Sequence, residues 1–320
     1  MNKKLSRILS ITLPLLLGVF LIIYSYNSFT PQQRDTMIGY FADADYTYIF
    51  ISLFFALTGY ISRAYRWRYT LEHLGYHSPF FTNFFAVSIG YFLNLTIPRS
   101  GEVSRALVIK NYSGVPFDKG FGTIISERVV DLLILILVVG ATLLLQFDVL
   151  STYLSEKIPY EKLLFYGSIG GILFIGGILF FIYSKLSWVA KIKIKVAGLA
   201  EGTMSVFKMR NKWPFLLHSA YIWVAYIIMF YVTIYALPET ATMSIGAVAT
   251  AFVIGSLAIT FTNGGFGVYP VVLAAILQLY NVPPEAGTAF GWIVWTSQII
   301  FIIFLGGLSF LLLPLLYSKK

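Results

Sequence analysis

Six ionisable residues lie inside or beside stretches that are otherwise apolar enough to enter a membrane: Arg99, Glu102, Arg105, Glu127, Arg128 and Asp131. An ionisable group at membrane depth costs at least about 2.5–3.5 kcal/mol on insertion scales, so we expect each one to be paired and to face the protein interior. At helical spacing Glu102 and Arg105 are i,i+3 neighbours, as are Arg128 and Asp131. Glu127 shares a face with Asp131 at i,i+4. Three bases and three acids make this set formally neutral.

These residue types allow two kinds of site. In the first, Arg99 and Arg105 present guanidinium forks to a phosphate, while Glu102, Glu127 and Asp131 orient the arginines or bind a coupling cation. In the second, the same side chains form a salt-bridge clamp that joins two segments near the cytoplasmic interface. Both interpretations stay open, because a clamp can also line a pathway.

Two loops could supply backbone contacts to a ligand. Pro98 followed by Arg-Ser-Gly-Glu resembles the start of a helix, and such an N-terminus inside the membrane offers N–H groups to an anion. Asn94 could add a polar contact at that tip. Farther along, Asn263, Gly264, Gly265 and Gly267 form a loop whose backbone can approach a ligand closely, or which simply permits a tight turn.

Composition shows what must position these residues. Of the 320 residues 58% are apolar and only 12% charged, and mean hydropathy is +0.78. A water-soluble globule could not bury so much apolar surface, so lipid must be the solvent for most of the chain. This excludes a soluble enzyme, a disordered chain and a secreted disulfide scaffold. The chain has no Cys, which excludes thiolate chemistry and Cys-bound metal, and we predict neither a metal nor a cofactor.

The hydropathy pattern predicts an all-α polytopic membrane protein with one domain, residues 1–320. Six stretches are long enough to span a bilayer: Leu9–Asn27, Tyr46–Ala64, Phe121–Leu145, Leu163–Ser184, Pro214–Ala236 and Thr288–Leu315. Two further apolar stretches, 79–111 and 242–282, are interrupted by polar residues, Gly and Pro. We predict that each folds back as a re-entrant helical hairpin, with its two ends on one side of the membrane.

The distribution of positive charge favours this topology. Of 23 Lys and Arg residues, about 17 fall on one side, three outside (Arg34, Lys157 and Lys162) and three at membrane depth, so the positive-inside rule places both termini in the cytoplasm. The basic loop 185–213 is then cytoplasmic and explains most of the net charge of +9 without nucleic acid. Arg63, Arg66 and Arg68 are interpreted as interface anchors at the end of a span, not as part of a site.

The predicted order of elements contains an inverted repeat. A span, a hairpin and a second span occur twice, with opposite orientations and with a Gly/Pro-interrupted stretch in the corresponding place of each unit. Such a pattern is typical of secondary transporters whose substrate site lies between the repeats.

Three motifs together resemble the lysylphosphatidylglycerol synthase transmembrane-domain family, also called flippase-like domain proteins. They are Asn94-Leu-Thr-Ile-Pro-Arg-Ser-Gly-Glu-Val-Ser-Arg105, Glu127-Arg-Val-Val-Asp131 and Gly264-Gly-Phe-Gly267. The resemblance covers nearly the whole chain and implies a multi-pass protein of a prokaryotic cell (inner) membrane. Its better-understood relatives move an anionic or aminoacylated phospholipid between leaflets. They often place an acidic residue shortly after the glycine loop, where this chain has Tyr269 and Pro270, so we expect a different headgroup preference.

The leading hypothesis is therefore a flippase-like transporter of an anionic or phosphate-containing lipid. We expect its substrate contacts at Asn94, Arg99, Glu102, Arg105, Glu127, Arg128, Asp131, Asn263, Gly265 and Gly267. No soluble aminoacyl-transferase sequence follows in the chain, and we expect no enzyme activity. Two alternatives remain: a non-catalytic assembly partner of a lipid or glycan biosynthesis enzyme, and an integral-membrane enzyme that uses Glu127 or Asp131 as a general base on a lipid headgroup. The lipid, the direction of transport, the coupling ion and the oligomeric state are not predicted.

Overall fold

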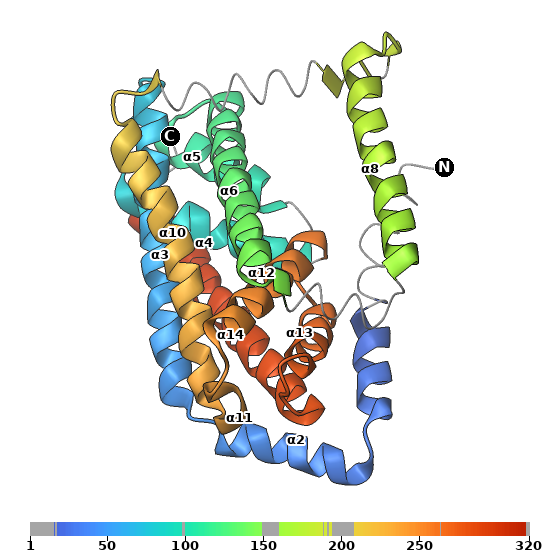
Figure 1. The fold of residues 1–320 in the computed structure, drawn as a ribbon. Coiled ribbons are helices and arrows are strands. Elements are labelled where there is room, and N and C mark those ends of the chain that lie inside the picture. The colour runs from blue at the N-terminus through green and yellow to red at the C-terminus, as the bar shows by residue number, and fades with distance from the viewer. Residues whose placement is uncertain are drawn as a thin grey trace.

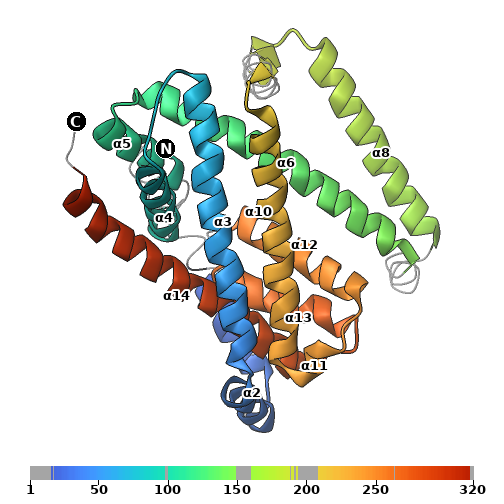
Figure 2. The ribbon, with the colours of Figure 1, turned by 90° about the vertical axis from the view of Figure 1, so that its left-hand side faces the viewer.

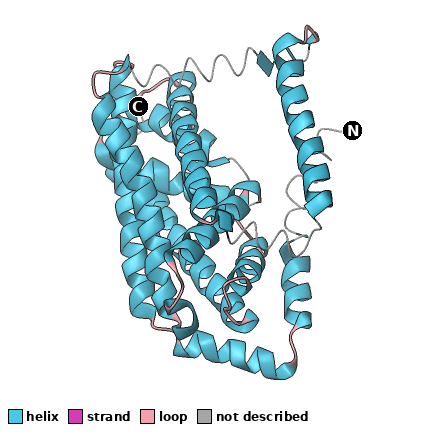
Figure 3. Cartoon of the chain, viewed as in Figure 1, coloured by secondary structure: helices cyan, strands magenta, loops and turns pink. Residues whose placement is uncertain are grey.

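A computed structural model describes residues 16, 18–97, 100–148, 160–187, 189–190, 192–193, 208–262 and 264–317. Every regular element in these ranges is a helix (Figure 3). The helices are α2 Pro31–Asp43, α3 Tyr46–His73, α4 Phe80–Thr96, α5 Ser100–Ser113, α6 Phe117–Leu145, α8 Tyr160–Tyr183, α10 Lys212–Thr233, the 3₁₀-helix η1 Ile234–Ala236, α11 Pro238–Ala241, α12 Ile245–Phe261, α13 Val268–Gln278 and α14 Pro284–Leu316.

Four helices of the described ranges are long and apolar enough to cross a membrane: α3, α6, α10 (continued by η1) and α14. They coincide with four of the six predicted spans, which confirms a polytopic all-α protein. A further predicted span, Leu163–Ser184, lies almost wholly in α8. The first predicted span, Leu9–Asn27, begins outside the described residues. Most of the predicted basic loop 185–213 also lies outside them.

Each interrupted apolar stretch folds as a pair of short helices that pack against each other, α4 with α5 and α12 with α13. The first pair is close because two glycines meet at the contact. A Cβ on Gly90 would lie only 2.8 Å from Arg105 Cγ and 3.0 Å from the Gly101 carbonyl oxygen. Asn94, near the end of α4, accepts a hydrogen bond of 2.7 Å from the Gly101 backbone N–H and so caps the start of α5.

The turn between α12 and α13 depends on glycine. Gly264, Gly265 and Gly267 have φ values of 66°, 79° and 67°, in the left-handed region that costs other residues energy. The Thr262 hydroxyl accepts a hydrogen bond from the Gly265 N–H at 3.0 Å, and Trp295 of α14 donates its indole N–H to the Gly264 carbonyl at 2.8 Å. The loop is thereby fixed to α14.

Helices α3 and α10 form an antiparallel pair along one side of the molecule (Figures 1 and 2). At one end of this pair the Asp45 N–H donates to the Ala236 carbonyl at 2.9 Å, and at the other Arg66 donates to Ser219. Several other contacts are related by exchange of two halves, the first made of α3, α4, α5 and α6 and the second of α10, α12, α13 and α14. The contacts of α3 with α4, α5 with α6 and α4 with α14 correspond to those of α10 with α12, α13 with α14 and α12 with α6.

Two large apolar cores each lie mainly in one half, although the first includes Leu305 of α14 and the second Ile49 of α3. In the first half Trp67 and Leu71 of α3 pack with Ile109 of α5 and Ile124 of α6. In the second half buried aromatic and aliphatic side chains of α10, α12, α13 and α14 form a larger core, which includes Phe230, Phe252, Leu273 and Phe290. Burial of these side chains supplies the main stabilisation inside each half.

Candidate functional site

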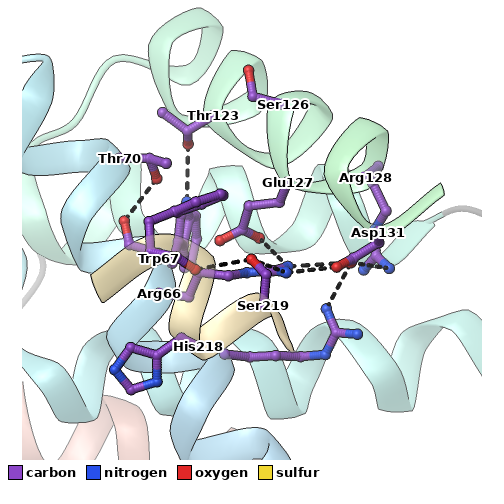
Figure 4. A network of polar contacts seen from close by, with 12 residues as sticks. Arg66, Trp67, Thr70, Thr123, Ser126, Glu127, Arg128, Asp131, His218 and Ser219 are labelled. Atoms are coloured by element: carbon purple, nitrogen blue, oxygen red, sulfur yellow. Dashed lines mark hydrogen bonds and ion pairs between the residues drawn. The ribbon is translucent and has the colours of Figure 1, made fainter. Parts of the chain in front are cut away.

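Seven ionisable side chains from three helices of the first half form one connected cluster. Figure 4 shows part of it, with Arg66, Glu127, Arg128 and Asp131 labelled. Helix α3 supplies two arginines, α5 supplies Glu102 and Arg105, and α6 supplies Glu127, Arg128 and Asp131. Arg66 and Glu127 are fully buried, and the two other most enclosed arginines, Arg63 and Arg105, are only 4% and 3% exposed. Throughout the following text, "the charged cluster" means Arg63, Arg66, Glu102, Arg105, Glu127, Arg128 and Asp131.

Asp131 connects α6 to α3. Its two carboxylate oxygens accept from both terminal nitrogens of Arg66, at 2.5 and 3.2 Å, and one oxygen also accepts from Arg63 Nη1 at 3.1 Å. Arg66 further donates to the Ser219 hydroxyl of α10 at 3.2 Å. This one carboxylate therefore holds two buried guanidinium groups, and through Arg66 it reaches the second half of the molecule.

Glu127 connects α6 to α5, one helical turn from Asp131. It accepts from Arg105 Nη2 at 2.9 Å and lies 3.6 Å from Arg66 Nη2. The Arg105 guanidinium also stacks on the Trp67 ring, with 4.2 Å to the ring centroid, and the Trp67 indole donates to Thr123 of α6 at 2.9 Å. Stacking and ion pairing therefore fix Arg105 in one orientation.

The border of the cluster is more open. Arg128 lies 3.3 Å from Glu102 of α5 and 3.8 Å from Asp131, and its side chain is 37% exposed, against 21% for Glu102. Glu102 thus pairs with a residue of another helix instead of its own i,i+3 neighbour. Several buried polar atoms in the cluster have no hydrogen-bond partner among the described residues, including Glu127 Oε1, Glu102 Oε2 and the Nε atoms of Arg66 and Arg105.

A second polar layer adjoins Arg63. Its Nε and Nη2 both donate to the Tyr226 hydroxyl of α10, at 3.1 and 2.9 Å, and the Tyr226 hydroxyl lies 3.2 Å from that of Tyr91 in α4. The Tyr91 ring in turn packs against Tyr60, with centroids 4.8 Å apart. This layer connects the charged cluster to the first helix of the α4–α5 pair.

The structure brings together five of the predicted site residues: Glu102, Arg105, Glu127, Arg128 and Asp131. Asn94 caps α5, while Gly265 and Gly267 belong to the α12–α13 turn. Arg99 and Asn263 lie outside the described residues.

The interpretation of Arg63 and Arg66 as interface anchors is wrong, because both are buried and both pair with Asp131. Arg68 does lie at the surface, 51% exposed and paired with Glu72. The signal that could have separated them is helical periodicity. Arg63 and Arg66 share a face at i,i+3, and Trp67 follows on that face, whereas Arg68 lies on another. Tyr91 and Tyr226 carried no sequence signal, because phenols are common in an aromatic membrane protein.

The charged cluster carries four arginines and three carboxylates, so its formal charge is one positive instead of the predicted zero. Such a group can attract an anion and can exchange hydrogen-bond partners without creating new unpaired charges.

In the ranges that the structure describes, His, Asp and Glu side chains do not gather in a group of three that could hold a metal ion. A cavity of about 240 Å³ lies elsewhere, lined by residues 22–29, α2 and α14, including Met37, Phe41 and Trp292.

A family model and one relative of similar length indicate the same family. A model of the lysylphosphatidylglycerol synthase TM region matches residues 8–306. A UPF0104 membrane protein of Methanocaldococcus jannaschii is 22% identical over 319 residues, which cover 89% of this chain and 90% of that protein. The glycosyltransferase AglD of Haloferax volcanii is 29% identical over 145 residues, 44% of this chain but only 22% of AglD. No solved structure matches the chain significantly.

Proposed function

The chain belongs to the family of the lysylphosphatidylglycerol synthase transmembrane region, and from this membership and the charged cluster we propose that it moves an anionic, phosphate-containing lipid between the leaflets of a prokaryotic cell membrane. The observation that carries the proposal is the surplus positive charge of a buried group of four arginines and three carboxylates. Charged groups inside membrane proteins are costly and mark substrate or ion pathways.

The short helix pairs support a transporter architecture. Helix α4, with 17 residues, is about 26 Å long, and α13, with 11 residues, about 17 Å. Neither length reaches across a hydrocarbon core of about 30 Å. We therefore infer that both pairs are re-entrant hairpins that enter from opposite sides. The corresponding contacts of the two halves support an inverted repeat, in which rocking of one unit against the other exposes the site to each leaflet in turn.

In this proposal the lipid headgroup passes along the charged cluster while its acyl chains stay in the bilayer. Arg105 and the more exposed Arg128 neutralise the phosphate. Glu127 and Asp131 hold the arginines while the headgroup is absent. Because each carboxylate already has arginine partners, an entering phosphate can take over one guanidinium without leaving the others unpaired.

Reconstitution tests the proposal directly. Vesicles with the purified protein and a trace of fluorescent phosphatidylglycerol, phosphatidylcholine or polyprenyl phosphate are treated with dithionite, which bleaches only the outer leaflet. We expect the protein to increase the bleached fraction for at least one anionic lipid, and Arg105→Ala to abolish the increase. Glu72→Gln, at the surface pair with Arg68, is the matched control and should leave the rate unchanged. If wild type and empty vesicles agree for every lipid, the transport proposal is wrong.

A second function is favoured by one comparison. The 145 residues shared with the glycosyltransferase AglD are compatible with a non-catalytic membrane partner of a lipid or glycan biosynthesis enzyme. Affinity purification from the native membrane distinguishes the two. A stoichiometric synthase partner, together with full function of Arg105→Ala in the cell, would favour the assembly role over transport.

A further inference from the structure

We infer that Arg63, Tyr226 and Tyr91 form the phosphate-recognition point of the charged cluster, with the Tyr226 hydroxyl occupying the position of a phosphate oxygen until a headgroup arrives. This inference deepens the proposed function and rests on it for the identity of the substrate. It starts from the way each arginine of the cluster is used.

Arginine presents two parallel N–H donors that match the oxygens of a carboxylate or a phosphate. In Arg66 the two terminal nitrogens face the two oxygens of Asp131. In Arg63 only Nη1 reaches Asp131, while Nε and Nη2 both point at one phenol oxygen, that of Tyr226, at 3.1 and 2.9 Å. A fork suited to an anion is therefore filled by a neutral group.

The number of charges in the cluster supports an anion at the Arg63 fork independently. The cluster has one arginine more than it has carboxylates, and Arg63 has to share Asp131 with Arg66. A buried positive charge without its own counterion is costly. A single negative charge at the Arg63 fork would balance the described cluster, and a phosphodiester carries one such charge.

The two phenols complete the recognition point. Because the Tyr226 oxygen accepts two N–H groups from Arg63, its own proton is directed to the Tyr91 oxygen 3.2 Å away. Among the described residues Tyr226 is the only hydrogen-bond partner that the structure gives the Tyr91 hydroxyl, so the Tyr91 proton can be donated to a ligand. The side chains of Tyr91 and Tyr226 are only partly buried, and they lie on α4 and α10, one from each half. A phosphate oxygen that takes the place of the Tyr226 hydroxyl would meet the two N–H donors of Arg63 and the O–H donor of Tyr91.

Binding measurements on the full chain in a neutral detergent test this assignment. The probes are phosphatidylglycerol, phosphatidylcholine and inorganic phosphate, with dissociation constants from native mass spectrometry or thermophoresis. We expect Arg63→Lys, which keeps the charge but loses the fork, to weaken phosphatidylglycerol binding at least about tenfold. Tyr226→Phe removes the competing oxygen and should strengthen binding about threefold to tenfold. Tyr91→Phe should weaken it about threefold.

Tyr231→Phe is the matched control, because Tyr231 lies on the same helix as Tyr226 but its hydroxyl contacts Tyr235 instead of Arg63. The affinity of this variant for phosphatidylglycerol should stay within about twofold of wild type. If Tyr226→Phe weakens binding as much as Arg63→Lys, or if neither changes it, the inference is wrong. Phosphatidylcholine binding as tight as that of phosphatidylglycerol would also overturn it, because the choline cation cancels the required charge.

Inorganic phosphate distinguishes recognition of the phosphate group alone from recognition of the whole lipid headgroup. Competition by millimolar phosphate, lost in Arg63→Lys, would assign recognition to the phosphate group alone, while lipid binding without such competition would assign it to the whole headgroup. The dithionite assay on the same variants separates this inference from the proposed function. Unchanged lipid movement in Arg63→Lys would remove the inference and leave transport intact. Lipid binding by the wild type without any lipid movement would leave this inference intact and show that the transport proposal is wrong.

Discussion

Asp131→Asn is the most direct test of the charged cluster as a structural unit. The substitution keeps the shape of the side chain and one acceptor oxygen. It removes the carboxylate that, among the described residues, alone contacts Arg63, and it removes the main partner of Arg66. The formal charge of the described cluster then increases from one positive to two. Because Arg63 and Arg66 are 4% and 0% exposed, water cannot replace the lost charge.

The expected size follows from this burial. Removing one partner of a buried ion pair typically costs about 3–5 kcal/mol, and Asp131 serves two arginines directly and lies 3.8 Å from a third, Arg128. We therefore expect the free energy of unfolding to fall by at least about 3 kcal/mol, more than a hundredfold in the unfolding equilibrium constant. The control is Glu72→Gln. Its partner Arg68 is 51% exposed, so the same loss of a carboxylate should cost at most about 1 kcal/mol.

Equilibrium unfolding in mixed detergent micelles measures both changes. Tryptophan fluorescence is a suitable signal, because Trp67 is fully buried and stacks on Arg105 of the cluster. The result that refutes the reasoning is an Asp131→Asn variant no less stable than Glu72→Gln. Asp131 would then contribute no more than a surface carboxylate, and the cluster could not be the group that joins α3 to α6.

Further predictions concern the two helix pairs. Gly90→Ala should lower the free energy of unfolding by about 1–3 kcal/mol, because its methyl group would lie 2.8 Å from Arg105 Cγ; the same unfolding assay measures this, and a neutral result would mean that α4 and α5 can separate freely. Asn94→Ala should cost about 0.5–2 kcal/mol through loss of the α5 cap, with Asn94→Ser as the variant that retains part of it. The chain lacks Cys, so single cysteines can report topology: the variants His77→Cys and Ser113→Cys should react with an impermeant maleimide from one face of the membrane, and Met243→Cys and Asn281→Cys from the other. Reaction of His77→Cys and Ser113→Cys from opposite faces would show that the first pair crosses the membrane.

The fold was largely predictable from the sequence because its main signals are one-dimensional. Apolar length predicted the helices now seen as α3, α6, α10 and α14, and the polar and Gly/Pro interruptions predicted the two helix pairs. The ends of helices were less predictable. Helix α6 begins at Phe117 instead of Phe121 and α14 at Pro284 instead of Thr288, because the first turn of each is more polar than the membrane span itself.

The site was only partly predictable because it depends on contacts between helices. The residues of α5 and α6 were found because charges in apolar segments are conspicuous. Arg63 and Arg66 were assigned to the interface because they follow an apolar span, where basic residues are usually anchors. Helical periodicity places them on one face with Trp67, and the packing of α3 against α6 and α10 shows that this face is buried. Tyr226 and Tyr91 acquire a role only through Arg63, which no pattern along the chain reports.

The two halves share a contact pattern and both have apolar cores, but only the first also contains the charged cluster, which indicates where movement is easiest. The second half has an apolar core that includes Phe230, Phe252 and Phe290, and opening it would expose apolar area without any compensating contact. The first half contains a network of ion pairs and phenols, in which Arg63 can exchange Tyr226 for a headgroup oxygen while the number of satisfied donors stays the same. We therefore expect the α4–α5 pair to be the element that rearranges when a headgroup binds, and α12–α13 to act as its fixed counterpart. Ligand-dependent cysteine accessibility confined to α12–α13 would contradict this assignment, because the apolar half would then open before the charged half.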